Sequence, residues 1–393
     1  NYYYPTNDLV TAPEIMFFWV ARMIIAGYEY KGEMPFKNVY YTGIVRDKQG
    51  RKMSKSLGNS PDPIELINKY GADGVRVGML LSSPAGNDLP FDESLCEQGR
   101  NFTTKIWNAF KLVNMWEVAD ITQPQSSKVA LEWFENKLSK TLEEINGSYD
   151  KFRISEALMS TYKLVYDDFS GWLLEMVKPA YQQPIDKTTL TKLKDLFEQV
   201  LVVMHPFTPF ISEEIWHFLA KKDENETINN QNWPKNTKIN ENQLSEFDKA
   251  AEVISGIRTI RKDNNLAQKN AIELRVKKGE NYSELFDSVI IKMGNVSSFE
   301  FVTEKQENAF SFIVKGNEYY IPFGDTIDVE AEKAKLEEEL NYTKGFLNSV
   351  MKKLNNERFV AGAPEQVVAN EKAKQQDAEQ KIAILEEKLK GLK

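Results

Sequence analysis

A helical apolar period runs almost without interruption from residue 92 to residue 219. In the segment NFTTKIWNAFKLVNMW, residues 101–116, apolar side chains recur at three- and four-residue spacings, which places them on one helix face. Similar stripes recur over residues 131–145, 154–176 and 190–204. Successive amphipathic helices bury their apolar faces against one another, so this pattern predicts a helix bundle over residues 92–225.

The segment HPFTPFISEEIWHFL contains one helix start of this bundle. Pro206 and Pro209 interrupt the preceding helix, and Ser212 is a residue type favoured at a helix N-cap. The two glutamates that follow it would lie in the first turn, where negative charge is favourable. The sequence therefore predicts a new helix from Ser212. His205 is expected to be a structural histidine at the helix boundary rather than a catalytic base.

An α/β pattern precedes the bundle. Residues 15–27, IMFFWVARMIIAG, predict a buried helix ended by glycine, and residues 36–45, FKNVYYTGIV, predict a short buried strand. A polar loop follows, and DPIELINKYGADGVRVGMLLSSP then predicts two helical runs separated at Gly71. Helix, strand, loop and helix in this order are typical of the last part of an α/β domain, here residues 1–91.

The pattern changes again after residues 226–243, an Asn-rich segment without an apolar period that we interpret as a linker. Residues 245–264 predict a helix, and a second helix is predicted near residues 282–293. The segments AIELRV, SSFEFV, FSFIVK and EYYIPF predict four short strands. Residues 244–329 are therefore expected to form a small α+β domain.

The last stretch, residues 330–393, carries two seams of apolar residues at alternating steps of four and three. Gly362 and Pro364 lie between the seams, which predicts an antiparallel coiled-coil hairpin. Such a hairpin could be an intramolecular arm or a dimerisation coil. The short intervening turn favours the arm, so we expect a monomer. The first seam comprises Leu336, Leu340, Thr343, Leu347, Val350 and Leu354, and the second comprises Ala378, Ile382, Leu385, Leu389 and Leu392.

Composition excludes several kinds of site. The 393 residues are 41% hydrophobic, which is globular composition, and include one cysteine, Cys96, and two histidines. A single cysteine forms no intrachain disulfide, and these counts cannot supply a Cys or His cluster for a structural metal. No window reaches the roughly 18 apolar residues of a membrane helix, so we expect a cytoplasmic protein without a membrane partner.

Positive charge is concentrated locally, although the net charge of the chain is −8. Residues 46–58 hold five basic residues against one acidic residue, and residues 258–278 hold seven against two. Local basic patches attract phosphates even in an acidic protein. The second patch could equally be the solvated surface of a loop and a helix.

The first patch contains the loop GRKMSKSLGN, residues 50–59. Lysines are compact cations suited to phosphate oxygens, and serines add hydroxyl donors. Gly50 and Gly58 bend at little cost, so the loop can close over a triphosphate as negative charge builds up during phosphoryl or nucleotidyl transfer. The P-loop pattern occurs nowhere in the chain. An ordinary basic surface hairpin is the alternative interpretation.

The motif KMSKS at residues 52–56 resembles the signature loop of class I aminoacyl-tRNA synthetases, and its surroundings are most similar to the valyl-tRNA synthetase family. The similarity continues in FFWVARM, RNFTTKIWNA, MHPFTPFISEEIW and LNNERFVAGAPEQVVANEKAK, and it covers nearly the whole chain. The last segment is the most discriminating, because the C-terminal coiled-coil arm is a valyl feature. The resemblance implies the end of a Rossmann-like catalytic domain, a helical anticodon-binding domain, the small α+β domain and a tRNA-binding arm.

The resemblance also implies ATP-dependent activation of valine to valyl-adenylate and its transfer to the valine tRNA, with Mg²⁺ accompanying ATP. Lys52 and Lys55 match the two lysines of the family loop, which stabilise the ATP phosphates during adenylate formation. Ser54 and Ser56 match the serines that would assist them.

Further ATP and valine contacts are implied upstream. Gly43, Ile44 and Val45 match the strand whose backbone meets the adenine ring. Trp19 matches the tryptophan that helps to wall the valine side-chain pocket, with packing in the core as its alternative role. Where the family has Gly-x-Asp to contact the ribose, this chain has Ala-Pro-Glu, so Glu14 would accept the ribose hydroxyls through a longer side chain.

The resemblance implies tRNA contacts in the helical part and on the arm. Arg100 and Asn101 would meet the anticodon stem or loop, although Arg100 could equally belong to a salt-bridged helix face. Lys352, Lys353 and Arg358 on the arm would touch the outer corner of the tRNA. Phosphate contacts of this kind depend strongly on salt concentration.

The second class I signature, HIGH, requires two histidines spaced by two residues, which His205 and His217 cannot provide. We therefore expect a fragment that lacks the first half of the catalytic domain and the editing domain, inactive alone but able to contact tRNA. Two alternatives remain. An isoleucyl-type fragment is disfavoured because the C-terminal zinc-binding cysteines of that enzyme are absent, and a noncatalytic tRNA-binding or scaffold module would have kept only the fold.

Overall fold

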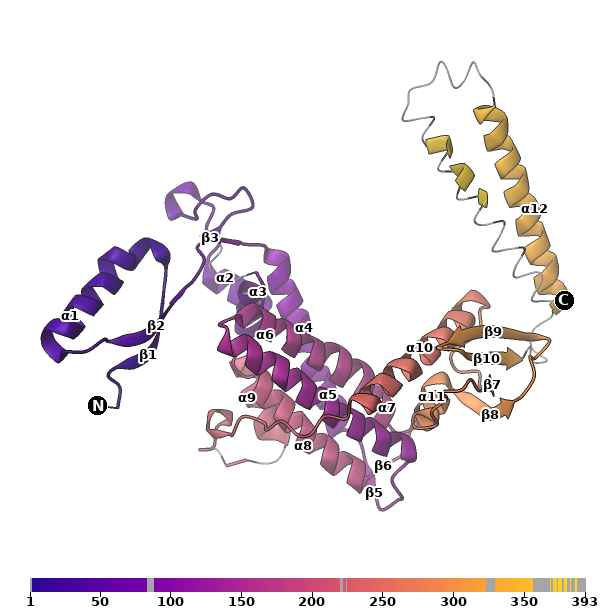
Figure 1. Ribbon diagram of the computed structural model, residues 1–393, viewed down its shortest axis with the longest axis horizontal. Helices are drawn as coiled ribbons and strands as arrows, with labels where there is room; N and C mark the ends of the chain where they lie inside the picture. Colours follow the sequence, from indigo (N-terminus) through magenta and orange to yellow (C-terminus); the bar gives the residue numbers. More distant parts are fainter. Residues whose placement is uncertain are drawn as a thin grey trace. The chain divides into compact units, whose positions relative to one another are not determined.

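The computed structural model describes residues 2–82, 88–219, 222–223, 225–322 and 329–355, together with single residues and short runs between 368 and 386. This part of the chain is mostly helical with small sheets, and it divides into two compact units, Asn1–Phe247 and Asp248–Lys393 (Figure 1). A multidomain architecture is thus confirmed at this level. The four-part division proposed from the sequence stays a prediction.

The first unit begins with a parallel strand pair joined by a helix. Strands β1 (Thr6–Thr11) and β2 (Phe36–Tyr41) pair in parallel, and α1 (Ala21–Lys31) lies between them in the chain. A helix and a strand form in the predicted regions, but the helix runs past the expected glycine and is C-capped by Gly32 in the left-handed region, with φ of 73°. The expected burial is wrong: Phe17, Phe18 and Ile25 are 61% to 77% exposed. Strand β2 ends at Tyr41, and only its first residue, Phe36, is buried. Short strands β3 (Val45–Arg46) and β4 (Leu89–Pro90) form a second parallel pair.

The helix bundle follows. Its core holds large side chains that are almost completely buried, including Trp133, Phe134, Phe169 and Phe197, because the apolar stripes of successive helices face one another. Figure 1 shows the long helices side by side. Its elements are α4 (Glu93–Asn114), α5 (Gln125–Asp150), α6 (Ile154–Lys163), the π-helical Leu164–Leu173, α7 (Leu174–Val177), α8 (Lys187–Met204) and α9 (Pro209–Leu219).

Two short helices connect the basic loop to this bundle. They are α2 (Pro63–Tyr70), capped by the side chain of Asp62, and α3 (Ala72–Leu81). Helix α3 packs against α4 with backbones in close contact, since a Cβ atom on Gly78 would lie only 2.6 Å from the backbone nitrogen of Cys96. Any side chain at Gly78 would push the two helices apart.

The predicted start of α9 at Ser212 is wrong. The helix begins at Pro209, and Ser212 lies inside it, donating its hydroxyl to a backbone carbonyl at 2.7 Å. The first-turn amides of Phe210 and Ile211 donate instead to the carboxylate of Asp73 on α3, at 3.3 and 2.7 Å. A carboxylate placed 137 residues earlier in the chain therefore satisfies amides that a local N-cap would otherwise bind.

Asp73 is buried, and burial raises the pKa of its carboxyl, while the two amide donors act in the opposite direction. Its neighbour Arg76 strengthens the same junction by donating to the carbonyl groups of Pro206 and Phe207 at 3.0 and 3.3 Å. Helix α3 is therefore fixed to the α8–α9 turn by backbone-directed bonds from two side chains.

His205 has both ring nitrogens in contacts with neighbouring side chains. Nδ1 lies 2.7 Å from the Ser212 hydroxyl, and Nε2 lies 3.0 Å from the Asn229 amide oxygen. These contacts support the interpretation of His205 as a structural residue at the helix boundary.

Helix α10 (Glu241–Asp263) begins in the first unit and continues into the second from Asp248. The second unit also contains a four-stranded sheet of order β8-β7-β10-β9 and α11 (Asp287–Gly294). The four predicted strands are confirmed, and the predicted helix near residue 282 begins at Asp287. β7 and β8 are parallel, whereas β10 is antiparallel to both β7 and β9. The strands are β7 (Ile272–Lys277), β8 (Val296–Val302), β9 (Ala309–Val314) and β10 (Asn317–Pro322).

One arginine of the second basic patch is structural. Arg261, 3% exposed, donates to the backbone carbonyls of Ala267, Asn270 and Gly294 at 2.8 to 2.9 Å. These bonds connect the end of α10 to the end of α11. The charge count of this patch therefore overstates the charge available to a partner.

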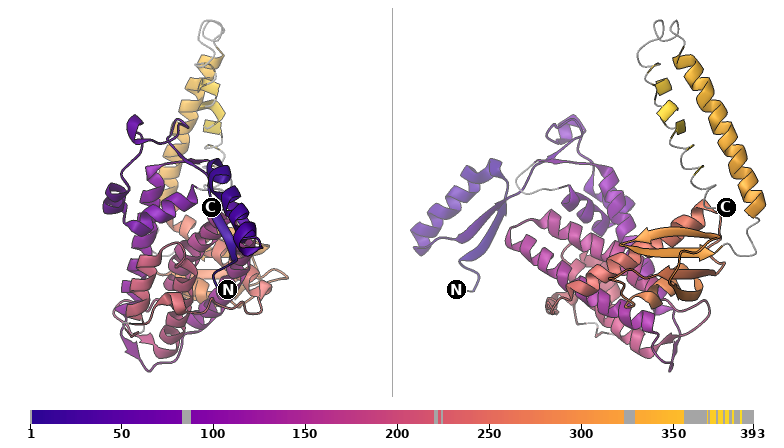
Figure 2. Two further views of the ribbon diagram at one scale, coloured as in Figure 1. Left: turned by 90° about the vertical axis from the view of Figure 1, so that its left-hand side faces the viewer. Right: turned by 45° about the vertical axis from the view of Figure 1, so that its right-hand side comes forward.

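The arm is built on α12 (Val329–Leu354), a single long helix (Figure 2). Lys344 pairs with Glu386 at 2.6 Å, and Lys353 pairs with Glu371 at 3.6 Å, so the returning residues run antiparallel to α12. The seam positions Thr343, Val350 and Ala378 are buried. The expected turn at Gly362 and Pro364 lies outside the described residues. Among the helices that the structure describes, none combines the length and apolarity that a membrane crossing requires.

Removing the Asp73 carboxylate should loosen the start of α9. We expect Asp73→Ala to leave two amides unsatisfied and to cost about 2 kcal/mol locally. Hydrogen exchange of the Phe210 and Ile211 amides, measured by mass spectrometry, should then rise about tenfold or more. Asp73→Asn, which keeps one acceptor oxygen, should have a smaller effect.

The exposed Asp120 provides a matched control, because Asp120→Ala should leave exchange in α9 unchanged. Equal exchange in Asp73→Ala and Asp120→Ala would contradict the capping role of Asp73.

Candidate functional site

The basic loop turns at both of its glycines in the left-handed region. Gly50 has φ of 77° and Gly58 has φ of 61°, conformations that cost glycine little. Between them, Lys55–Leu57 form one short 3₁₀ turn, whose start is capped by the Ser54 hydroxyl accepting the Leu57 amide at 3.2 Å. The two glycines therefore reverse the chain at the ends of a small structured loop.

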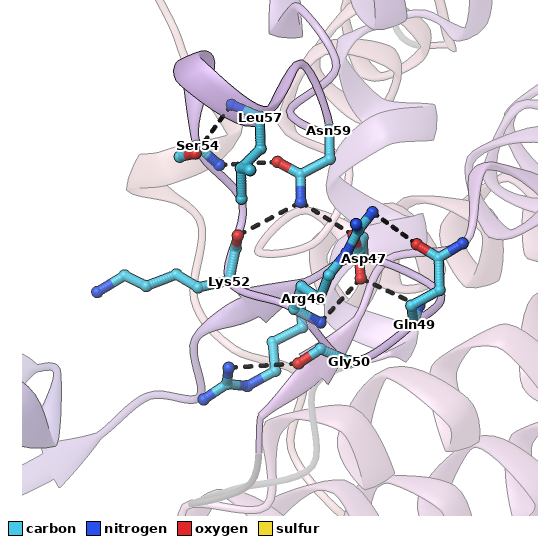
Figure 3. A network of polar contacts seen from close by, with 9 residues as sticks. Arg46, Asp47, Gln49, Gly50, Lys52, Ser54, Leu57 and Asn59 are labelled. Carbon is cyan, nitrogen blue, oxygen red and sulfur yellow. Dashed lines mark hydrogen bonds and ion pairs between the residues drawn. The ribbon is translucent and has the colours of Figure 1, made fainter.

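A buried carboxylate organises the base of this loop (Figure 3). Asp47 is 8% exposed and accepts from the backbone amides of Gln49 and Arg51 at 3.0 and 2.8 Å. It also accepts from Arg51 Nε at 2.8 Å and from Asn59 Nδ2 at 2.9 Å. These donors, the Asn59 amide first among them, lower the pKa of Asp47 to about 2. The carboxylate is therefore ionised at neutral pH.

Asn59 connects this carboxylate to the lysine-bearing segment. Its Nδ2 donates to Asp47 and also to the Lys52 carbonyl at 3.3 Å. Its Oδ1 accepts the Ser54 amide at 2.9 Å. Figure 3 shows the Asn59 side chain between these groups. The side chain thus holds the backbone on both sides of Met53.

The structure brings Glu14 and Lys52 together. Lys52 Nζ lies 2.8 Å from Glu14 Oε2, and both side chains are about half exposed. Glu14 lies on the short 3₁₀ turn Pro13–Ile15, just before the helical segment that carries Trp19. Ser54 and Ser56 place their hydroxyls 3.1 Å apart on the same loop. The cations and hydroxyls expected around a triphosphate therefore share one exposed loop.

The strand expected to meet adenine is fixed by residues from another segment. The amide of Ile44 donates to Asp88 Oδ1 at 3.3 Å, and its carbonyl accepts the Leu89 amide at 2.8 Å. Asp88 also forms an ion pair with Arg46. Val45 pairs with Leu89 in the parallel ladder, and Gly43 directly precedes these contacts.

Trp19, the residue expected in the valine pocket, is 58% exposed and lies beside Phe17 and Phe18, which are 77% and 61% exposed. Three consecutive exposed aromatic residues form an apolar surface that a solvated protein does not usually leave uncovered. Within this chain Trp19 does not pack in the core.

The expected tRNA contacts lie on α4 and on the arm. Arg100 forms an ion pair with Glu97 at 3.1 Å, and Asn101 is exposed beside it. Lys352 and Lys353 are exposed on α12. Arg358 lies outside the described residues.

A pocket with a volume of about 640 Å³ lies at the C-terminal end of α4. The indole of Trp116 is half-buried here, and Tyr181, on the lining segment 178–183, is 89% exposed. Gln182 has a positive φ of 60°, which marks a tight turn at the pocket edge. The lining residues are Leu112, Met115, Trp116, Glu117, Lys178, Pro179, Ala180, Tyr181, Gln182 and Gln183.

Sequence reasoning missed Asp47, Asn59 and Asp88. The segment DKQG at residues 47–50 carried a recognisable turn signal, an Asp followed three residues later by Gly. Asn59 and Asp88 act through contacts with other segments and left no local signal. Within the described part of the chain, no three His, Cys, Asp or Glu residues are grouped as a metal site.

Three family models match successive parts of the chain. Residues 1–92 match tRNA synthetases class I (I, L, M and V), and residues 132–277 match the anticodon-binding domain of tRNA ligase. Residues 328–393 match the valyl tRNA synthetase tRNA binding arm.

Curated relatives match over all 393 residues. The chain is 60% identical to a valine–tRNA ligase of Christiangramia forsetii, 58% to one of Phocaeicola vulgatus and 56% to one of Parabacteroides distasonis. In each case 100% of this chain matches 45% of the relative, so the chain spans less than half the length of these relatives. The chain thus carries a class I segment, an anticodon-binding segment and a valyl-type arm in succession, and over its whole length it is similar to the C-terminal part of valine–tRNA ligases.

Proposed function

We propose that the protein containing this chain is a valine–tRNA ligase, which activates valine with ATP and transfers it to the valine tRNA. The single observation that carries this proposal is the 60% identity to a valine–tRNA ligase across the whole chain, basic loop and arm included. The chain supplies the phosphate loop, the helix bundle and the arm. Because the arm folds back on itself, we propose that the protein acts as a monomer. We also propose that it works in the cytoplasm.

The loop fits the charge changes of adenylate formation. A carboxylate oxygen of valine attacks the α-phosphorus of ATP, the bond to the bridging oxygen breaks, and pyrophosphate leaves with the electron pair. Lys52 and Lys55 donate to phosphate oxygens as charge shifts toward the leaving group, with the Ser54 and Ser56 hydroxyls beside them. Mg²⁺ bound with ATP supplies further neutralisation of phosphate charge.

Glu14, Trp19 and the 43–45 strand complete the proposed small-molecule site. Glu14 binds Lys52. When ATP draws Lys52 to the phosphates, the freed Glu14 carboxylate would accept a ribose hydroxyl. Trp19 presents an exposed indole suited to an apolar side chain such as that of valine. The backbone of Gly43, Ile44 and Val45 would face adenine.

Replacing either loop lysine should slow amino-acid activation in the full-length protein. We expect Lys52→Ala and Lys55→Ala each to lower kcat for valine-dependent ATP–pyrophosphate exchange by about 10²-fold, because a phosphate donor is lost in the transition state. Lys48→Ala is the matched control: Lys48 belongs to the same patch, is 74% exposed and pairs with Asp92 at 3.5 Å. It should retain nearly full activity.

The same assay separates the candidate functions. Exchange that depends on isoleucine rather than valine would support the isoleucyl-type alternative. A full-length protein that binds tRNA without any exchange would support the noncatalytic module and overturn the proposed activity.

We propose that the pocket at the end of α4 receives a base of the anticodon loop. The segment 178–183 lies within the part that matches the anticodon-binding domain. The Trp116 and Tyr181 rings offer surfaces for base stacking, and Gln182 and Gln183 offer amides for base edges. Arg100, Asn101 and the arm lysines would add phosphate contacts along the tRNA.

Tyr181→Ala should weaken tRNA binding by about 1–3 kcal/mol, the usual contribution of one aromatic stack on a base. Fluorescence anisotropy with valine, isoleucine and methionine tRNAs across a salt series measures this effect. Phe210→Ala removes an aromatic ring that is 64% exposed elsewhere on the bundle and should leave affinity unchanged. An unchanged affinity in Tyr181→Ala would exclude the pocket as a base site.

A further inference from the structure

We propose that Asn59 is a positioning residue for amino-acid activation: anchored on Asp47, its side chain fixes the loop backbone that carries Lys52 and Ser54. This inference rests on the proposed function and deepens it, because it assigns a role to a residue outside the KMSKS motif. Asn59 acts through the loop and makes no contact with ATP itself.

The bonds of the Asn59 amide support an indirect role. A carboxamide offers two N–H donors and one oxygen. Both donors point inward, to Asp47 at 2.9 Å and to the Lys52 carbonyl at 3.3 Å, and the oxygen accepts the Ser54 amide at 2.9 Å. With these bonds made, neither N–H remains to donate to a phosphate.

The position of these bonds explains their effect on the lysine. They hold the carbonyl of Lys52 and the amide of Ser54, so they fix the backbone immediately before and after Met53 (Figure 3). Lys52 Nζ itself stays exposed and can exchange partners. The arrangement therefore fixes the backbone of Lys52 while its Nζ can change partners.

The anchor is rigid because Asp47 is held from several directions. Gln49 and Arg51 donate backbone amides to it, and the Arg51 guanidinium donates from the side. The loop between Gly50 and Gly58 would otherwise lose considerable conformational entropy each time it closed over a substrate. We call the bonds of Asn59 to Asp47, Lys52 and Ser54 the brace of the loop. Because the brace is formed before a substrate binds, it removes part of that entropy cost.

The chemistry at position 59 is restrictive. Asn59→Ala removes all three bonds of the side chain. Asn59→Asp replaces the two N–H donors with an acceptor oxygen facing the Asp47 carboxylate and the Lys52 carbonyl, so repulsion replaces attraction. The aspartate variant should therefore impair the loop more than the alanine variant.

The test is ATP–pyrophosphate exchange with the full-length protein and valine. We expect Asn59→Ala to lower kcat about tenfold with little change in the KM for valine, and Asn59→Asp to lower it further. Asn68→Ala, at an exposed position on α2, is the matched control and should behave as wild type. Asp47→Asn is a second variant that weakens the anchor while keeping its shape, and it should also reduce kcat.

A double-mutant cycle distinguishes positioning from general damage. If Asn59 acts through Lys52, Asn59→Ala should cost much less in a Lys52→Ala background than in wild type. Additive losses, or a kcat for Asn59→Ala equal to that of Asn68→Ala, would overturn the proposal.

A structural readout separates this proposal from the proposed function. Trypsin cleaves after Arg51, Lys52 and Lys55, so loss of the brace should accelerate cleavage in the loop about tenfold without a change in overall circular dichroism. A wild-type protein without valine-dependent exchange would refute the proposed function. Equal cleavage rates in Asn59→Ala and Asn68→Ala would refute the brace itself.

Discussion

The close packing of α3 against α4 is the constraint on which the first unit depends. The absence of a side chain at Gly78 lets the two backbones meet, and Asp73 and Arg76 on the same helix bind the α8–α9 turn. Helix α2 joins this assembly because Lys69 and Tyr70 both donate to Glu93 at the start of α4, at 2.7 and 2.8 Å. The base of the basic loop is thus connected to the helix bundle by short, directed contacts.

The charge pattern divides into structural and available cations. Arg51 is bound to Asp47, Arg46 to Asp88, and Arg261 to backbone carbonyls. Arginine suits these roles because its planar guanidinium donates in several fixed directions. Lysines, in contrast, carry the exposed charge on the loop and on the arm. A local count of basic residues therefore marks where phosphate binding is favoured but does not say which residue performs it.

Much of the local structure could be predicted from the sequence, because apolar periodicity and glycine position are local signals. The four strands of the second unit and the long bundle helices follow from them directly. The start of α9 could not be predicted, since its capping carboxylate, Asp73, comes from another helix. Ser212 is a favourable cap by residue type, but the helix already starts at Pro209, where Asp73 accepts the amides of Phe210 and Ile211.

In the candidate site, too, some features follow from local sequence signals and others from tertiary contacts. The KMSKS motif and its glycines identify the loop, whereas the roles of Asn59 and Asp88 depend on contacts that only folding creates. The position of Glu14 beside Lys52 also joins residues 38 positions apart. Residue identity indicates the chemistry of the site, and the tertiary contacts determine the geometry in which that chemistry can occur.

The ion pair between Lys52 and Glu14 is suited to exchange because it is weak. Both side chains are about half exposed, and such surface pairs contribute only about 0–1 kcal/mol. A triphosphate offers several charged oxygens, and charge-assisted bonds to them are stronger than a solvated ion pair. Under the proposed function, Lys52 would therefore leave Glu14 at little cost when a nucleotide arrives. Under the proposed function, the part-buried bonds of Asp47 and Asn59 would keep the backbone in place during this exchange, so the weak and the strong contacts of the loop would serve different steps.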